Sequence, residues 1–246
     1  MTATLLPAPL AESQQSLASF WDPASGARFE AHTPSSRPDL WSQYVAGITA
    51  SYQKFDVLKV LDLDALSSGD TTSLFFVAIG PDENVVAGVR FHGPLNNATE
   101  AYALEEFASD PHGVAMIRRL IDDRLMFGIT EIKGGWVDQD VDRRRDLGNA
   151  LARSFLHGMT VLGVQFAFCT AATHAIGRWL TTGGREITGL EPVPYPDDRY
   201  RTGMMWWDTA TINVYGDPAQ LRRFHAESAA LGDSTPARPV ASAGAV

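Results

Sequence analysis

A run of three arginines, with a glycine shortly after it, is the part of this sequence best suited to binding an anion. The arginines occupy residues 143–145, between a strand predicted over residues 129–137 and a helix predicted from Leu147, and Gly148 falls in that helix's first turn. The free N–H groups and the positive dipole end of a first helical turn favour an anion. Arginines add charge-assisted hydrogen bonds, and a glycine lets the backbone approach a ligand closely. The pattern predicts a phosphate-binding loop; the alternative is a solvated, charged helix face.

A carboxylate in the preceding strand has the chemistry of a general base. Alternation along that strand places Glu131 on one face together with Lys133, Gly135 and Val137. A carboxylate at such a position can accept a proton from a group bound beside it. The alternative is a structural role, in which Glu131 pairs with Lys133 or with an arginine at the sheet edge.

The elements that position these residues follow from the hydrophobic pattern. Apolar residues at spacings of three and four predict a helix over residues 37–52. An apolar run over residues 74–79, a turn and a return over 85–91 predict a β-hairpin. Further helices are predicted over residues 100–107, 114–127, 147–161, 174–181 and 218–230, and further strands over 129–137, 164–170 and within 186–215. Antiparallel strands followed by strand–helix–strand–helix predict an α+β fold with a mixed sheet.

The two ends of the chain differ in composition from its middle. Residues 1–28 are polar and contain several prolines, and they are predicted to form a loosely ordered N-terminal arm. Residues 231–246 are rich in Ala, Pro and Ser, which predicts a disordered tail. Residues 29–230 contain no linker-like segment and are expected to form a single domain.

The overall composition excludes several classes of function. The formal net charge of −9 and the lack of a long basic run disfavour nucleic acid as a partner. No apolar stretch is long enough to predict a membrane span, and a single cysteine fits a reducing cytoplasm. The six histidines lack metal-ligand spacing, so no metal is expected.

The stretch Arg145-x-x-Gly148-x-Ala150 resembles the pyrophosphate loop of the GNAT superfamily of acyltransferases, which reads Gln/Arg-x-x-Gly-x-Gly/Ala. Its place between a strand and a helix extends the resemblance over about residues 37–212. The resemblance implies a GNAT fold, with a V-shaped splay of the central sheet that holds the pantetheine arm of an acyl donor. The donor-binding residues it implies are Val137, Arg143, Arg144, Arg145, Gly148, Asn149 and Ala150. The loop is longer than is usual in the family, so the leading arginine of the triplet stays open.

The same resemblance bears on the proton-transfer groups. Glu131 precedes Val137 by the spacing at which several family members carry a general base. The family's usual general acid is a tyrosine, but Trp179 stands near that place and an indole cannot deliver the proton. His174 is an alternative acid, although a capping or packed histidine is equally consistent with the sequence.

A long insertion with two predicted helices separates the hairpin from the strand over residues 129–137. It resembles the insertion in the autoinducer synthases and the N-acyl amino acid synthases, which are GNAT-fold enzymes that take acyl groups from acyl carrier protein. By this resemblance Arg90 lies near the acceptor pocket; the alternative is a surface strand residue. The aromatic residues that could line an acyl tunnel, although core packing explains them equally well, are Phe166, Phe168, Trp179, Trp206 and Trp207. Cys169 is expected to be a core residue.

The resemblance therefore implies an N-acyltransferase with Glu131 and Arg90 as catalytic residues. The donor would be acyl-CoA or an acyl-phosphopantetheine, and the acceptor the amine of an amino acid or similar small molecule. Acyl carrier protein is a further candidate partner. Because the family's tyrosine is missing, a non-catalytic module that binds an acyl carrier or CoA stays open as the alternative.

Overall fold

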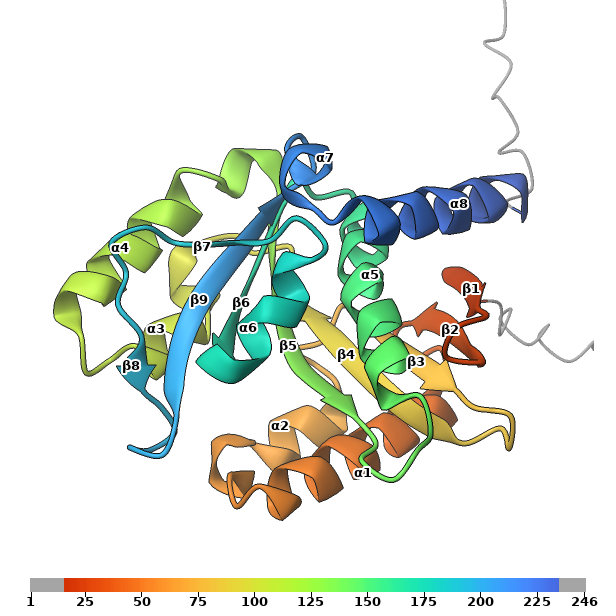
Figure 1. Cartoon of the computed structure of the whole chain (residues 1–246). Helices are drawn as coiled ribbons and strands as arrows, with labels where there is room; N and C mark the ends of the chain where they lie inside the picture. Colours follow the sequence, from red (N-terminus) through yellow and green to blue (C-terminus); the bar gives the residue numbers. More distant parts are fainter. Residues whose placement is uncertain (1–15, 235–246) are drawn as a thin grey trace, which may run out of the picture.

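One nine-stranded mixed sheet runs through residues 16–234, the part of the chain that the computed structural model describes (Figure 1). The strand order is β1-β2-β3-β4-β5-β6-β9-β7, and β8 pairs with β9 outside this path. The strands are β1 (Ala18–Asp22), β2 (Ala27–His32), β3 (Leu74–Ile79), β4 (Val85–His92), β5 (Ile129–Val137), β6 (Phe166–Ala172), β7 (Arg185–Glu186), β8 (Val193–Pro194) and β9 (Arg201–Asp208). All paired strands are antiparallel except β5 and β6, which confirms the predicted mixed sheet.

Helices cover both faces of this sheet. The helices are α1 (Pro38–Lys54), α2 (Leu63–Ser68), α3 (Ala103–Glu106), α4 (Pro111–Asp122), α5 (Arg144–Leu162), α6 (Thr173–Leu180), α7 (Ile212–Tyr215) and α8 (Pro218–Ser234), with 3-10 turns η1 (Leu58–Val60), η2 (Ala98–Glu100) and η3 (Leu125–Phe127). The alternation of β3 explains how α1 and α5 come to lie on opposite faces. Phe75 and Val77 pack in the core beneath α1, whereas Phe76 and Ala78 pack in the core beneath α5.

Strands β5 and β6 separate after a short stretch of pairing, and this opens the sheet into a V (Figure 1). Their parallel ladder pairs residues 129–131 with residues 166–168, although both strands continue beyond it. Gly134 has a φ of 61°, a conformation that glycine adopts readily, and the β4–β5 register shifts beside it, between Gly88 and Arg90. The hydroxyl of Tyr44 in α1 donates a 2.9 Å hydrogen bond to the carbonyl of Gly134. The predicted V-shaped splay is confirmed.

The predicted insertion between the hairpin and the central strand is also confirmed. Residues 93–128 connect β4 to β5 and contain η2, α3, α4 and η3. Helix α4 begins earlier than expected because Asp110 caps it, accepting a 3.1 Å hydrogen bond from the N–H of His112, and Pro111 is its first residue.

The predicted loosely ordered arm over residues 1–28 is wrong for its second part. Strands β1 and β2 form an antiparallel hairpin, and Ala18 and Phe20 are buried in the core beneath α5. The strand is stabilised by pairing and burial, which the local composition does not reveal. Residues 1–15 lie outside the described residues. The predicted tail begins inside α8, which continues to Ser234, and residues 235–246 lie outside the described part.

A buried arginine joins the N-terminal hairpin and α8 to α5. Arg153 of α5 is fully buried, and its Nη2 donates a 2.6 Å hydrogen bond to Asp22 of β1. Its Nε donates to both carboxylate oxygens of Glu227 in α8, at 2.9 and 3.0 Å, and Nη1 donates to Gln220 at 2.7 Å. A buried guanidinium neutralised by two carboxylates is costly to disturb.

Candidate active site

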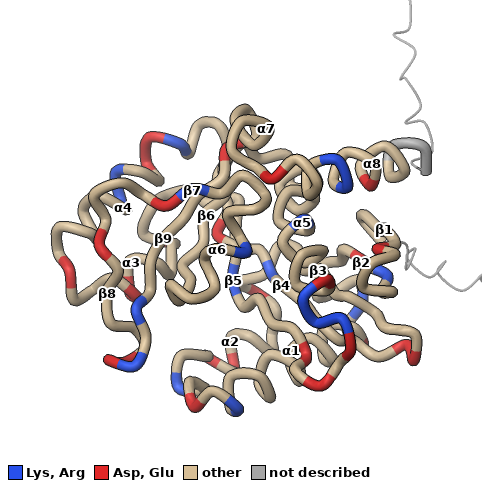
Figure 2. Tube along the Cα trace, in the orientation of Figure 1, with Lys and Arg blue, Asp and Glu red and all other residues tan. Residues whose placement is uncertain are grey.

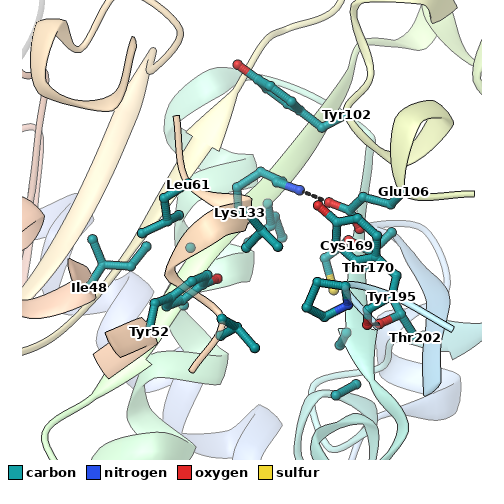
Figure 3. Close-up of a pocket in the computed structure, with 18 of the residues that line it drawn as sticks. Ile48, Tyr52, Leu61, Tyr102, Glu106, Lys133, Cys169, Thr170, Tyr195 and Thr202 are labelled. Carbon is teal, nitrogen blue, oxygen red and sulfur yellow. Dashed lines mark hydrogen bonds and ion pairs between the residues drawn. The ribbon is translucent and has the colours of Figure 1, made fainter. Parts of the chain in front are cut away.

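A cavity of about 610 Å³ lies where β5 and β6 separate (Figure 3). Its walls come from α1, η1 and α2 on one side, from α3, α5 and α6, and from the β8–β9 turn. Its apolar lining includes Ile48, Phe55, Val57, Val60, Leu61, Leu66, Phe155 and Trp179. A cavity of this size and composition suits a small organic ligand.

The polar end of the cavity contains an ion pair between Lys133 of β5 and Glu106 of α3 (Figure 3). Both side chains are largely removed from solvent, and the ring of Tyr102 lies 5.3 Å from Lys133 Nζ. Burial alone would lower the pKa of Lys133, but the carboxylates of Glu106 and Glu131 outweigh it and raise that pKa above its ordinary value. Lys133 therefore remains charged beside the cavity.

Arg90 of β4 stands opposite Lys133 in the sheet register and also lines the cavity. The residue is 8% exposed. Its Nη1 donates two long hydrogen bonds of 3.4 Å, to the carbonyl of Thr71 and the hydroxyl of Thr72, and its guanidinium lies 5.6 Å from the ring centre of Tyr102. Within residues 16–234 no carboxylate forms an ion pair with Arg90. A buried guanidinium without a carboxylate partner is a site for an anionic group of a ligand.

Glu131 lies next to this cluster but does not line the cavity. Its carboxylate is fully buried and accepts hydrogen bonds from the backbone N–H groups of Tyr102 at 2.8 Å and Ala103 at 3.0 Å. One oxygen lies 3.9 Å from Lys133 Nζ. Burial raises the pKa of Glu131 to about 7. The carboxylate thus holds the first residues of α3, whereas Glu106, paired with Lys133, is among the carboxylates that line the cavity, together with Asp62 and Glu105.

The phosphate-binding loop predicted from the sequence is the N-terminus of α5. Arg143 precedes the helix with a φ of 60° and provides no side-chain cap. The first helical hydrogen bond runs from the N–H of Leu147 to the carbonyl of Arg143, at 3.0 Å. The N–H groups of residues 144–146 have no acceptor within the described part of the chain. They are therefore available to an anion.

The three arginines of this loop point to different surroundings. Arg144 donates to the side-chain oxygen of Gln139. A Cβ placed on Gly26, in the β1–β2 turn, would lie 3.5 Å from Arg143 Nη1, so Arg143 is directed toward that turn. Arg145 is exposed. Arg144 and Arg145 are thus the members of the triplet best placed to serve the helix N-terminus.

Arg178 of α6 completes a cationic cluster at this helix end, and sequence reasoning missed it. A Cβ on Gly148 would lie 2.8 Å from Arg178 Nη1, so a larger residue here would displace this guanidinium from its present position. Partial burial lowers the pKa of Arg178, and the charges of Arg144 and Arg145 lower it further. Figure 2 shows basic positions both in the loop before α5 and in α6. No sequence signal could have revealed this contact, because it depends on the packing of α6 against α5.

The remaining predicted donor residues are placed in the core or at its edge. Val137 of β5 and Ala150 of α5 are buried in the core between the sheet and α5. Asn149 is half-buried, and its carbonyl accepts a 3.2 Å hydrogen bond from Gln220. None of residues 143–150 lines the cavity. The structure therefore brings Arg90 and the Lys133–Glu106 pair together and leaves the cationic loop as a separate site.

Trp179, at the place of the family's tyrosine, lines the cavity and packs 4.8 Å from the ring of Phe155. His174 lines the cavity from an exposed position. Tyr52 and Tyr195 also line it, and burial raises the pKa of each, so both keep their protons at neutral pH. Sequence reasoning missed both tyrosines because α1 and the β8–β9 turn meet only in the folded chain.

Core packing accounts for most of the aromatic residues considered for an acyl tunnel. Phe168 and Trp207 are fully buried and Phe166 is nearly so. Trp206 is half-buried against the guanidinium of Arg124, whose Cζ lies 4.5 Å from its ring centre. Of the five aromatic residues, Trp179 alone lines the cavity. Cys169 is buried as expected and also contributes to the cavity wall.

Within the described residues, no three His, Cys, Asp or Glu side chains are grouped to hold a metal ion. No helix in the same part of the chain is long and apolar enough to cross a membrane.

No family model matches the chain. Its sequence is 42% identical over 213 residues to the uncharacterized protein Rv1356c of Mycobacterium tuberculosis strain H37Rv. The matched region covers 87% of this chain and 81% of Rv1356c. The uncharacterized protein Mb1391c of Mycobacterium bovis matches with the same identity and coverage.

Several solved structures share the fold. The N-acyl amino acid synthase FeeM from uncultured soil microbes matches with a TM-score of 0.57 and 11% identity, over 79% of this chain and 97% of FeeM. The CoA-dependent acyl-homoserine lactone synthase BjaI matches with a TM-score of 0.52 and 17% identity, over 81% of this chain and 90% of BjaI. The CoA-dependent acyl-homoserine lactone synthase MesI matches with a TM-score of 0.51 and 13% identity, over 80% of this chain and 95% of MesI. At these identities the matches establish the fold, which is that of the GNAT acyltransferases.

Proposed function

We propose that this chain, which belongs to the same family as the mycobacterial proteins Rv1356c and Mb1391c, is an N-acyltransferase. It has the GNAT fold. It would move an acyl group from a phosphopantetheine thioester to the amine of a small molecule that carries a carboxylate, such as an amino acid. The observation that carries this proposal is Arg90, a buried guanidinium without a carboxylate partner among the described residues, in the wall of the cavity. The names of FeeM, BjaI and MesI support the reaction class.

The donor would bind at the N-terminus of α5. Its phosphates would accept hydrogen bonds from the free N–H groups of the first helical turn and from Arg144, Arg145 and Arg178. Beyond residue 131, the edge of β5 is unpaired on the side of β6 and can hydrogen-bond the amide groups of a pantetheine arm. Three convergent guanidinium groups suit the several phosphate charges of CoA better than the single phosphodiester of a carrier protein. We therefore propose acyl-CoA as the donor, with acyl carrier protein as the alternative.

The acceptor would bind at the polar end of the cavity. Its carboxylate would pair with Arg90, and its ammonium group would give a proton to Glu106, the cavity-lining carboxylate that forms an ion pair with Lys133. We propose that Glu131, predicted as the base, instead positions α3 and so holds Glu106 in place. Lys133 holds Glu106 at the cavity through their ion pair.

Acyl transfer then follows from the deprotonated amine. The free amine attacks the thioester carbonyl carbon, a C–N bond forms, and the C–S bond breaks. The leaving thiolate gains a proton from a protonated tyrosine of the cavity, Tyr52 or Tyr195, and the second proton of the nitrogen passes to that tyrosinate. Glu106 then releases the first proton to solvent. The products are an amide and a free thiol.

A panel experiment tests the proposal. Purified protein is incubated with acyl-CoAs of different chain length, or with acyl carrier protein, against free amino acids, and amide products are identified by mass spectrometry. We expect a product with at least one donor, with loss of most activity in Arg90→Gln and no loss in the control Arg119→Gln, which lies exposed on α4. Donor binding without product from any pair would instead indicate the non-catalytic binding module.

A further inference from the structure

Two segments that are distant in the sequence meet beside the cavity. Near the end of α1, Asp56 contacts Arg199 of the β8–β9 turn twice: Arg199 Nη1 lies 3.1 Å from the carboxylate of Asp56, and Nη2 donates to its carbonyl at 3.0 Å. Lys59 Nζ of η1 lies 3.1 Å from the carboxylate of Asp197 in the same turn. In Figure 1 the β8–β9 turn and the segment that follows α1 both lie in the lower left part of the molecule.

The same segments form part of the cavity wall. Phe55 and Val57 line the cavity from one side, and Tyr195, Pro196 and Tyr200 line it from the other. The hydroxyl of Tyr200 donates a 3.1 Å hydrogen bond to the carbonyl of Phe55. The cavity is thus closed here by contacts between two segments. We call these contacts, Asp56–Arg199, Lys59–Asp197 and Phe55–Tyr200, the latch.

The turn side of the latch is organised by its own hydrogen bonds. Asp197 accepts from Arg199 Nε at 2.9 Å and from the N–H of Arg199 at 3.2 Å, and its carbonyl accepts from the N–H of Tyr200 at 3.1 Å. Hydrogen bonds from Arg199 and Lys59 hold the pKa of Asp197 far below its ordinary value. The turn therefore presents a fixed guanidinium and a fixed carboxylate to the end of α1.

The ion pairs of the latch are weak enough to open. The side chains of Arg199 and Lys59 are 52% and 60% exposed, and exposed ion pairs are individually weak. It also lies apart from the proposed donor site, which is formed by α5 and α6. The latch therefore borders the cavity on a side that the donor phosphates do not need.

We infer that the latch is a size filter for the acceptor, admitting free small molecules and excluding amines that belong to a polypeptide. This inference rests on the proposed function, because it assumes that the cavity binds an amine acceptor. The cavity, of about 610 Å³, has room for a free amino acid at Arg90 without any movement of the latch. A polypeptide acceptor that left the cavity between the two segments would hold the latch open.

Accessibility of the cavity tests the latch without any reference to activity. Cys169 is the only cysteine in the sequence and lines the cavity, so its alkylation by iodoacetamide, followed by intact mass, reports how often the cavity opens. Removing two exposed ion pairs in Lys59→Ala/Arg199→Ala should speed alkylation about fivefold. The control Arg118→Ala/Arg119→Ala removes the same charge from exposed positions of α4 and should leave the rate unchanged. Equal rates in all three proteins would overturn the latch.

Two substitutions of Lys59 separate an open latch from a damaged fold, and both leave Asp197 and its hydrogen bonds to Arg199 in place. Lys59→Asp places two carboxylates opposite each other and should speed alkylation, whereas Lys59→Arg keeps the charge and should leave the rate near that of the unaltered protein. Equal alkylation rates in the two variants would contradict a role for this ion pair.

The size filter itself is measured on acceptors. The ratio of kcat/KM for a free amino acid to kcat/KM for a tripeptide beginning with that amino acid should fall at least about fivefold in Lys59→Ala/Arg199→Ala. An unchanged ratio together with faster Cys169 alkylation would show that the latch controls access to the cavity, but it would refute selection of acceptors by size. If no acceptor reacts at all, the proposed function fails, while the alkylation rates still decide whether the latch closes the cavity.

Discussion

Replacing Arg90 with glutamine should separate acceptors that carry a carboxylate from those that do not. The guanidinium uses only Nη1 within the described structure, in two bonds of 3.4 Å, so Nε and Nη2 are available for a two-point contact with a ligand carboxylate. Hydrogen bonds to charged groups contribute about 1.5 to 3 kcal/mol, which corresponds to roughly a 10- to 100-fold loss in kcat/KM. Because the existing bonds are long, we expect little change in folding stability.

The assay compares an amino acid with the amine that lacks its carboxylate. For the amino acid, Arg90→Gln should lower kcat/KM by about 10- to 100-fold, chiefly through KM. For the amine, wild type and variant should have similar values, because neither forms the carboxylate contact. Arg90→Lys should recover only part of the loss, since an ammonium group lacks the paired geometry of a guanidinium. An equal loss for both acceptors would refute the assignment and indicate that Arg90 supports the local structure.

Three further perturbations have defined outcomes. The pKa of Glu131 is raised by burial from 4.5 to about 7, so the folded state binds more protons than the unfolded state between these values and stability should fall as pH rises through this window. Glu131→Gln should flatten this dependence in urea unfolding measured from pH 4.5 to 7, and an unchanged slope would show that another group titrates. Arg178→Ala should weaken CoA binding about tenfold and reduce the salt dependence of that binding, as measured by calorimetry. Gly148→Ala should have a similar effect, because its Cβ displaces the Arg178 guanidinium. An unaltered CoA affinity in both variants would exclude Arg178 from the donor site. Arg153→Met leaves the buried carboxylates of β1 and α8 uncompensated and should lower the free energy of unfolding by about 3 to 5 kcal/mol, with a much smaller loss pointing to water entry.

The sequence predicted those parts of the fold in which local pattern and tertiary packing agree. The stripe of Trp41, Tyr44 and Ile48 identified α1, and all three residues are buried. The central strand was predicted with its observed bounds of Ile129–Val137, because a polar loop follows it directly. The hairpin β1–β2 was missed, since its short strands depend on pairing with β3 and on the buried contact between Asp22 and Arg153.

The site was predictable to the extent that a single segment carries it. The arginines and glycine at the start of α5 form one continuous run, so their position could be read directly. Glu106, Tyr195 and Arg178 come from three separate elements, and only the folded chain places them at the cavity or beside α5. Glu131 shows the limit of spacing arguments, because its carboxylate accepts two backbone N–H groups and does not line the cavity.

The most direct test of the proposed function is a single reaction followed at both products. Purified protein, one acyl-CoA and an isotopically labelled amino acid are incubated together, and the labelled amide and the free thiol of CoA are measured over time. We expect the two products to appear in equal amounts and to decline together in Arg90→Gln. Release of thiol without labelled amide, or no release of either from any acyl-CoA, would contradict the assignment of this cavity as an N-acyltransferase site.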